Sequence, residues 1–223
     1  MTVAGKLVVF EGTDGSGKST QFKLACEALS GAGQTFRTMV FPRYKEESSA
    51  LVRLYLGGRF GSKPSDVNAY AASTFYAVDR FAGYKEDWGG YYEEGGLMVS
   101  DRYTTSNAIH QASKLPPEER EEFFRWLGDF EYGRLGLPQP DLVLWMDMPI
   151  ERTVENLRRR ESDTNTTADI HEVDTDYLRS CYSAAAQAAE FYGWKAIRCV
   201  DEEGNLRSME DIHREVMELL THI

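Results

Sequence analysis

Residues 12–19 combine glycines with a lysine and a hydroxyl side chain in a spacing that suits phosphate binding. They read Gly-Thr-Asp-Gly-Ser-Gly-Lys-Ser and match the pattern G-x-x-x-x-G-K-[ST] in full. Glycines let such a loop curl until its backbone N–H groups point at phosphate oxygens, and a following helix adds its positive end. Lys18 can reach the β- and γ-phosphates, and the Ser19 hydroxyl can ligate Mg²⁺. The spacing therefore predicts a nucleotide site.

A second polar segment, residues 101–107, reads Asp-Arg-Tyr-Thr-Thr-Ser-Asn and directly follows a short apolar run. Ligands of a doubly wound sheet gather at the carboxyl ends of its strands, so Asp101 is expected beside the phosphate loop. Its carboxylate can hold Mg²⁺ through water or orient a substrate hydroxyl, and Arg102 offers a planar fork for a phosphate. The alternative is a structural Asp-Arg pair at a helix start, with Asp101 as the cap.

Three consecutive arginines, Arg158, Arg159 and Arg160, end a predicted helix and precede the polar segment 161–169. Phosphoryl transfer needs positive charge on the migrating group, and a movable lid that carries arginines supplies it while excluding water. We therefore predict a lid with a flexible loop at 161–169. The alternative is a solvated helix end, because the helix dipole favours basic residues there.

Two further features could bind the rest of a nucleotide. Tyr76 and Arg80 are four residues apart and share one helix face, where an aromatic ring and a cation could hold a planar base. Aromatic residues at this spacing are also common in protein cores. Arg43, in Phe-Pro-Arg after the second apolar run, is expected at the carboxyl edge of the sheet; the alternative is an ordinary surface arginine.

The elements that position these residues alternate between two kinds. Five short runs rich in apolar and β-branched residues read as strands buried on both faces, at 7–11, 35–41, 97–101, 142–147 and 196–200. Helical segments are expected at about 17–32, 65–85, 105–113, 117–132, 150–160, 174–192 and 208–220. This alternation predicts an α/β fold with a parallel central sheet.

Composition limits the class of protein. The chain has 223 residues, 42% of them hydrophobic, and a net charge of −11. The length suits one domain, and the hydrophobic content excludes a disordered chain. An acidic chain is not expected to bind nucleic acid by bulk charge. We expect no signal peptide and no membrane span, because the apolar runs are far shorter than about 20 residues. Three cysteines without a CxxC pair suggest thiols in a reducing cytoplasm.

Taken together, these motifs resemble the thymidylate kinase (dTMP kinase) family of P-loop nucleoside monophosphate kinases. The resemblance covers nearly the whole chain and includes Phe-Pro-Arg, Asp-Arg-Tyr-x-x-Ser, Pro-Asp-Leu at 140–142 and the arginine-rich segment. It implies a P-loop NTPase-type doubly wound sheet of about five parallel strands flanked by helices. It also implies one kinase domain over residues 1–223, a short lid at about 158–172 and a homodimer.

The resemblance also implies roles for individual residues. Asp14 would contact the sugar of the monophosphate, and Arg43 and Arg102 would hold its phosphate. Tyr76 would stack on thymine, Arg80 would hydrogen-bond to it, and Asn107 would reach the base edge. His110 would lie under the deoxyribose, and Ser106 would also bind the substrate. Ser19 and Asp101 would serve Mg²⁺. The ATP-binding residues would be Gly12, Thr13, Asp14, Gly15, Ser16, Gly17, Lys18, Ser19 and Thr20.

The expected reaction is transfer of the γ-phosphate of ATP to dTMP, giving ADP and dTDP, with Mg²⁺ and in the cytoplasm. Lys18 and Arg102 would be catalytic together with the three lid arginines, because Gly15 and Ser16 carry no charge where some members have an arginine. Two alternatives remain: another deoxynucleoside or nucleoside monophosphate kinase, and a P-loop binding or regulatory ATPase without a small acceptor. Neither nucleic acid nor a membrane is an expected partner.

Overall fold

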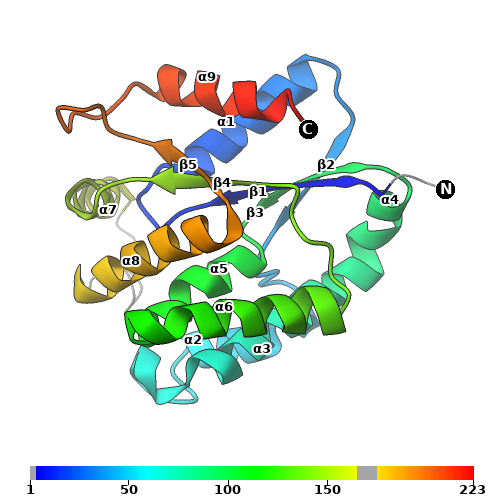
Figure 1. Cartoon of the computed structure of the whole chain (residues 1–223), viewed down its shortest axis with the longest axis vertical. Coiled ribbons are helices and arrows are strands. Elements are labelled where there is room, and N and C mark those ends of the chain that lie inside the picture. The colour runs from blue at the N-terminus through cyan, green and yellow to red at the C-terminus, as the bar shows by residue number, and fades with distance from the viewer. Residues whose placement is uncertain (1–3, 165–174) are drawn as a thin grey trace.

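The computed structural model describes residues 4–164 and 175–223 and is built around a five-stranded parallel sheet (Figure 1). The strands follow the order β2-β3-β1-β4-β5, and each pairs with its neighbours in parallel. Their bounds are β1 Lys6–Glu11, β2 Phe36–Val40, β3 Leu97–Asp101, β4 Leu142–Asp147 and β5 Lys195–Arg198. All five predicted strands are confirmed, with shifts of at most two residues at their ends.

The central strand is apolar along its length because both of its faces are covered. Val8 and Phe10 pack in the layer with helices α1 (Lys18–Gly31) and α9 (Met209–Leu220). Leu7 and Val9 face the opposite layer. None of these four side chains is exposed, as expected for a strand of a parallel sheet.

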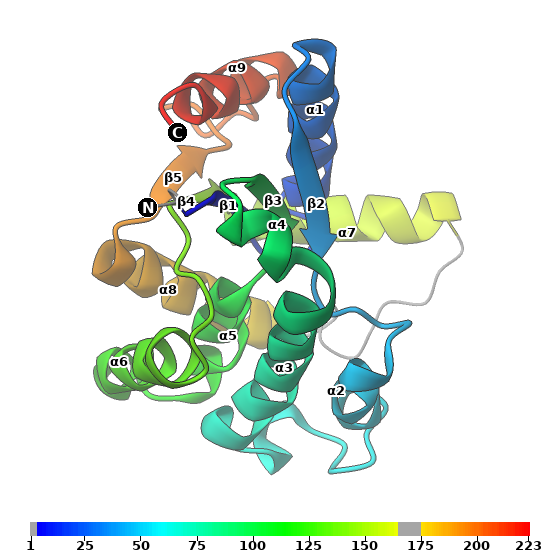
Figure 2. The same cartoon turned by 90° about the vertical axis from the view of Figure 1, so that its right-hand side faces the viewer.

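The helices form two layers, one on each side of the sheet (Figures 1 and 2). Helices α1 and α9 cover one face, and the other is covered by α3, α5, α6 and α8. Helix α4 lies at the amino-terminal end of the strands and α7 at the carboxyl end. The remaining bounds are α2 Ala50–Leu56, α3 Ala69–Gly83, α4 Gly89–Glu93, α5 Thr104–His110, α6 Arg120–Gly128, α7 Ile150–Thr164 and α8 Thr175–Tyr192.

The helical predictions need three corrections. The sequence did not indicate α2 or α4, which are only 7 and 5 residues long. The helix expected from residue 65 begins at Ala69, where the Asn68 side chain accepts a hydrogen bond from the Ala71 N–H and caps it. The predicted loop at 161–169 is wrong over 161–164, because α7 continues to Thr164; the rest of that loop and of the lid to residue 172 lies outside the described residues.

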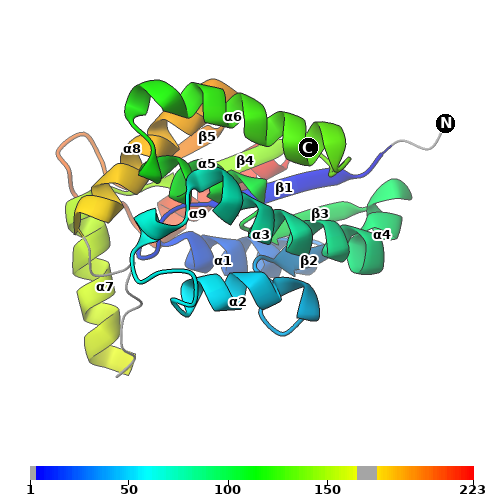
Figure 3. The ribbon, with the colours of Figure 1, turned by 90° about the horizontal axis from the view of Figure 1, so that it is seen from below.

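The carboxyl ends of the strands meet at the end of the sheet where α7 projects (Figure 3). There the phosphate loop leaves β1, and the Asp-Arg-Tyr segment leaves β3 directly beside it. Phe10 pairs with Asp101 in the strand register, and the Arg102 N–H donates to the Phe10 carbonyl oxygen at 3.1 Å. Parallel pairing thus joins two segments that are about 90 residues apart in the chain.

Candidate active site

The phosphate loop connects β1 to α1 and is shaped by glycine. Gly15 has a φ of +83°, and a Cβ there would meet the Thr153 carbonyl oxygen at 2.8 Å. A side chain would therefore be strained by the backbone and blocked by α7. Gly17 also lies in the left-handed region and immediately precedes α1. The loop is followed by a helix start, the arrangement in which backbone N–H groups and the helix dipole attract an anion.

Lys18, at the start of α1, forms an ion pair with Asp101, at the end of β3. The lysine is 5% exposed. Burial lowers its pKa and so does the nearby Arg102 guanidinium, while Asp101 acts in the opposite direction. Asp101, the carboxylate predicted to serve Mg²⁺, thus holds the Lys18 ammonium group, which the motif predicts to bind the phosphates.

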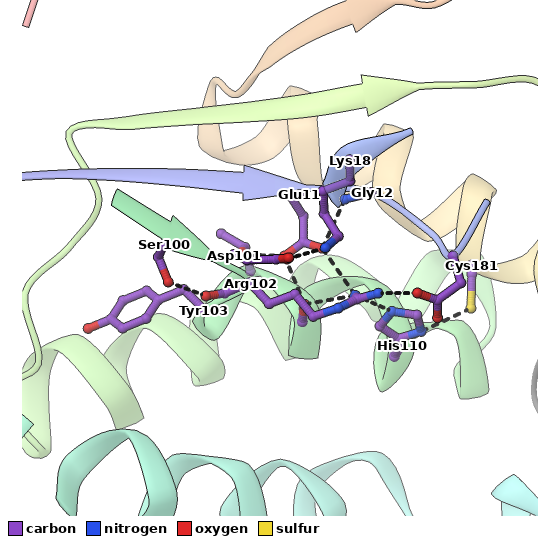
Figure 4. A network of polar contacts seen from close by, with 12 residues as sticks. Glu11, Gly12, Lys18, Ser100, Asp101, Arg102, Tyr103, His110 and Cys181 are labelled. Carbon is purple, nitrogen blue, oxygen red and sulfur yellow. Dashed lines mark hydrogen bonds and ion pairs between the residues drawn. The ribbon is translucent and has the colours of Figure 1, made fainter. Parts of the chain in front are cut away.

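Arg102 occupies the centre of a polar network (Figure 4). Its Nη2 donates to Asp14 Oδ1 at 2.9 Å, and its Nη1 donates to Ser106 Oγ at 3.3 Å and to His110 Nε2 at 3.1 Å. Burial acts to lower the pKa of Arg102, but Asp14 and Glu11 outweigh it and raise the pKa above its ordinary value. Arg102 also has a φ of +68°, a backbone conformation that costs a non-glycine residue about 1–2 kcal/mol. Surrounding contacts maintain this strain, which is common at functional sites.

Glu11 is the carboxylate on which this network rests, and sequence reasoning missed it. It is fully buried at the end of β1 and accepts hydrogen bonds from Thr105 Oγ1 at 2.7 Å, Ser106 Oγ at 2.8 Å and the Gly12 N–H at 3.0 Å. Arg102 Nη1 lies 3.5 Å from it. A charged residue that ends an otherwise apolar strand was the available signal.

A second buried network holds the two residues expected at the base. Arg80 donates from Nε and Nη2 to Glu131 at 2.6 and 2.5 Å. Asn107 Nδ2 donates to the same carboxylate at 3.2 Å. Burial alone would lower the pKa of Arg80, yet Glu131 raises it above the ordinary value. No sequence pattern indicated Glu131, which lies 51 residues from Arg80 in the chain.

A cavity of about 420 Å³ connects the two networks. This size lies within the range of small-molecule sites, about 300–1,000 Å³. The structure brings ten of the predicted site residues to its wall: Asp14, Lys18, Ser19, Tyr76, Arg80, Asp101, Arg102, Ser106, Asn107 and His110. The other residues predicted at ATP, Gly12, Thr13, Gly15, Ser16, Gly17 and Thr20, belong to the phosphate loop and the first turn of α1.

The cavity wall also contains residues that the sequence did not indicate, among them Tyr44, Tyr55, Gln111 and Tyr177. Gln111 is 3% exposed, and within the described chain its Oε1 has no hydrogen-bond partner, so it is available to a ligand donor. His110 Nε2 must accept from Arg102, because a guanidinium only donates; its Nδ1 therefore carries the proton and faces Tyr177 Oη at 3.1 Å. Tyr177 comes from α8, which no local motif connects to this site.

Arg43 is not among the residues that line the cavity. Its Nε lies 3.2 Å from Asp79 Oδ1, its Nη2 donates to Ser48 Oγ at 2.9 Å, and its Nη1 pairs with Asp87. The backbone turns after Pro42 so that this guanidinium points toward α3. The next residue, Tyr44, lines the cavity instead. The structure thus places the Arg43 guanidinium among these polar side chains and outside the cavity wall.

The three arginines predicted to belong to a lid lie on α7, which contacts the phosphate loop. Asn156 Nδ2 donates to the Gly15 carbonyl oxygen at 2.8 Å, and Arg159 Nη2 donates to Asn156 Oδ1 at 3.4 Å. The side chains of Arg158 and Arg159 are exposed and outside the cavity wall. The side chain of Arg160 lies outside the described residues.

A parallel sheet with a phosphate loop after its central strand, and a nucleotide-sized cavity at the carboxyl ends, defines a P-loop nucleotide-binding protein of the α/β class. The family model described as thymidylate kinase matches residues 10–203. The chain therefore belongs to the thymidylate kinase family, as the sequence motifs predicted.

Individual relatives agree with this assignment. The thymidylate kinase of Mycobacterium tuberculosis is 32% identical over 190 residues, which cover 84% of this chain and 87% of that protein. The probable thymidylate kinase of Pyrococcus horikoshii is 27% identical over 98% of this chain and 97% of its own length. A solved thymidylate kinase structure from Candida albicans has a TM-score of 0.70 at 17% identity, covering 98% of this chain and 92% of that one, and so shows the same fold.

Proposed function

We propose that this chain transfers the γ-phosphoryl group of ATP directly to dTMP, giving ADP and dTDP. Family membership supports the reaction, and one structural observation carries the assignment of the site. A single cavity runs from Lys18 of the phosphate loop, past Arg102, to Arg80 and Asn107 at its far end. It thus offers cations for phosphates at one end and hydrogen-bonding groups for a base at the other.

The chemistry requires positioning and charge neutralisation more than proton transfer. The attacking group of a nucleoside monophosphate is already an anionic phosphate oxygen, so no strong general base is needed. We assign the donor phosphates to the phosphate-loop N–H groups and Lys18, and the acceptor phosphate to Arg102. Asp14 holds the Arg102 guanidinium from the loop side at 2.9 Å, which fixes the fork before the substrate arrives.

The base would lie between aromatic and amide groups at the far end of the cavity. Tyr76 is mostly buried there and packs edge-on against Tyr55, with ring centroids 6.4 Å apart. Its ring can stack on a pyrimidine. Arg80 and Asn107 face the base edge, and the unpaired Gln111 Oε1 adds an acceptor. His110, with Ser106 beside it, faces the sugar.

The residues present fit Mg²⁺ bound together with ATP. Ser19 and Asp101 both line the cavity beside Lys18, and a hydroxyl and a carboxylate are oxygen ligands of the kind Mg²⁺ takes. Mg²⁺ usually completes its shell with water and substrate phosphates, so two protein ligands suffice. When bound, the ion neutralises charge on the transferring phosphates.

Positive charge for the migrating group would come from the lid arginines. Gly15 and Ser16 contribute none, and α7 is fixed against the loop through Asn156. Of Arg158 and Arg159, whose side chains the structure describes, Arg159 is connected to the loop through its 3.4 Å contact with Asn156. We therefore assign the transition-state contact to the segment from Arg158 to Arg160, within a lid over about 158–172 of one kinase domain spanning 1–223.

We further propose that the enzyme acts as a homodimer in the cytoplasm. Large apolar side chains are exposed on two neighbouring helices, at Leu51 and Leu54 of α2 and at Val78 and Phe81 of α3. Such a face is suited to burial against a second copy. The three cysteines are free thiols. No helix in residues 4–164 and 175–223 is long and apolar enough to cross a membrane.

An acceptor screen tests the proposed reaction. ADP release is measured with ATP and Mg²⁺ in the presence of each nucleoside and each nucleoside monophosphate. We expect dTMP to give the highest kcat/KM and thymidine to give none. A higher value for another monophosphate or for a nucleoside would favour a different kinase, and ATP turnover indifferent to every acceptor would favour a P-loop ATPase.

A further inference from the structure

The carboxylate of Glu131 is fully buried and surrounded by donors. It lies in the π-helical turn Asp129–Arg134 that follows α6. Besides the two Arg80 contacts and the one from Asn107, Thr104 Oγ1 donates to it at 2.9 Å. The two carboxylate oxygens thus accept four hydrogen bonds from three side chains.

This arrangement fixes which end of the Asn107 amide faces the cavity. Glu131 only accepts, so the Asn107 nitrogen must be the atom that faces it; the second N–H of that nitrogen is directed at the Ser73 carbonyl oxygen at 3.3 Å. The amide oxygen Oδ1 therefore lies on the opposite side. No hydrogen bond to Oδ1 is formed within residues 4–164 and 175–223, so Asn107 offers an acceptor to a ligand.

The same carboxylate fixes Arg80 as a donor. Glu131 accepts hydrogen bonds from both Nε and Nη2 of Arg80. Among the residues that the structure describes, Nη1 makes only a long contact, 3.4 Å to the Tyr103 carbonyl oxygen. Arg80 and Asn107 both line the cavity. The cavity end thus presents one donor and one acceptor, which complement a 4-carbonyl oxygen and an N3–H. Thymine and uracil have this edge, whereas cytosine reverses it with a 4-amino group and an unprotonated N3.

We propose that Glu131, which does not line the cavity, is a positioning residue that sets the base preference by orienting Arg80 and Asn107. The inference rests on the proposed function, because it takes a pyrimidine monophosphate as the ligand. An amide at position 131 could not replace the carboxylate, since its NH₂ group would face an Arg80 N–H in either orientation. The Asn107 amide would then be free to turn and present its nitrogen to the base.

The experiment compares Glu131→Gln, Glu131→Asp and the wild type. The measured quantities are the KM for dTMP, the KM for ATP and the inhibition constant of dCMP against dTMP. A matched control is Asp129→Asn, which removes a carboxylate of the same turn that pairs with Arg134 at the surface. Glu131→Asp keeps the charge opposite Arg80 and guards against a failure of Glu131→Gln to fold, which thermal unfolding detects.

We expect Glu131→Gln to raise the KM for dTMP at least tenfold, and Glu131→Asp, whose carboxylate still only accepts but is one methylene shorter, to raise it by a smaller factor. The KM for ATP should stay within threefold in both variants. The inhibition constant of dCMP should stay constant or fall, so the preference for dTMP over dCMP drops at least tenfold in Glu131→Gln and by less in Glu131→Asp. If Glu131 had a purely structural role, its replacement would weaken the binding of dTMP and dCMP equally. That result, or an unchanged preference for dTMP over dCMP in a folded variant, overturns the proposal. Failure of the reaction assignment would instead show as wild-type protein that does not use dTMP.

Discussion

Asn156 of α7 donates a 2.8 Å hydrogen bond to the carbonyl oxygen of Gly15 in the phosphate loop. Leu157 lies directly beside the same glycine, where a Cβ would approach its Cγ to 3.0 Å. Helix α7 is therefore seated on the loop one residue before its three arginines begin. The phosphate loop and α7 are thus in direct contact just before the segment Arg158–Arg160 begins.

The lid arginines are the first prediction. At least one of Arg158→Ala, Arg159→Ala and Arg160→Ala should lower kcat and kcat/KM together by about 10²-fold or more, as loss of an arginine finger does. ATP binding should weaken far less. The three need not be equal, since successive residues point about 100° apart on a helix. Steady-state kinetics of the single and triple mutants checks this, and a triple mutant with wild-type kcat would leave the arginines as a solvated helix end.

Lys18→Met should abolish transfer while the protein still folds. Removing one preorganised cation from the migrating phosphoryl should cost at least about 10²-fold in kcat. Lys23→Met, which removes an exposed lysine of the same helix, is the matched control and should change neither activity nor unfolding. Initial rates and thermal unfolding are measured on both. Near-normal turnover in folded Lys18→Met protein would mean that the loop is not the donor site.

Arg102→Ala should weaken use of dTMP strongly with little change in the KM for ATP, and Arg102→Lys should restore only part, because an ammonium lacks the fork. Glu11 keeps three other donors, so the fold should persist. Arg102→Gly should be more stable than Arg102→Ala by about 1 kcal/mol, because glycine adopts a φ of +68° without strain. Denaturant unfolding measures this difference. Equal losses of ATP and dTMP binding would contradict the assignment.

Arg43→Met should lower the free energy of unfolding and leave the KM for dTMP nearly unchanged. The guanidinium neutralises Asp79, which is 1% exposed, and breaking a buried pair typically costs about 3 kcal/mol. The KM for dTMP should change by no more than about twofold, because Arg43 does not line the cavity. The neighbouring Lys45→Met serves as an exposed control. Chemical denaturation with parallel kinetics checks this, and a tenfold rise in KM would restore the phosphate role.

Lys114 predicts a pH dependence of stability. Burial lowers its pKa from 10.5 to about 8, and its Nζ donates to Tyr55 Oη and the Val67 carbonyl oxygen. Between these two pH values the unfolded chain binds a proton that the folded chain has lost, so this group makes stability rise with pH. Relative to Lys114→Met, the free energy of unfolding of the wild type should therefore increase from pH 8 to pH 10. Urea unfolding across that range measures it, and parallel curves would contradict the shift.

The phosphate loop and the sheet were predictable because their signals are local. A glycine spacing specifies its own backbone shape, and strands covered on both faces are apolar along their length, as Leu7 to Phe10 are. Helix α2 was not predicted, because its seven residues make about two turns, which is too short for a helical pattern of apolar residues to show in the sequence. The Asp-Arg-Tyr segment lies beside the phosphate loop, as predicted, because neighbouring parallel strands end on the same edge of the sheet.

The sequence by itself determined the strands of the sheet, the phosphate loop and the family, since each is indicated by short motifs of consecutive residues. Only the tertiary structure decided which charges meet. Arg43 forms an ion pair with Asp79, and Arg80 forms one with Glu131, which lies 51 residues further along the chain. A buried charged side chain pairs with whichever opposite charge the packing of the fold brings next to it, because an unpaired buried charge strongly destabilises the folded state. That choice depends on how distant helices pack, which periodicity and spacing along the chain do not encode.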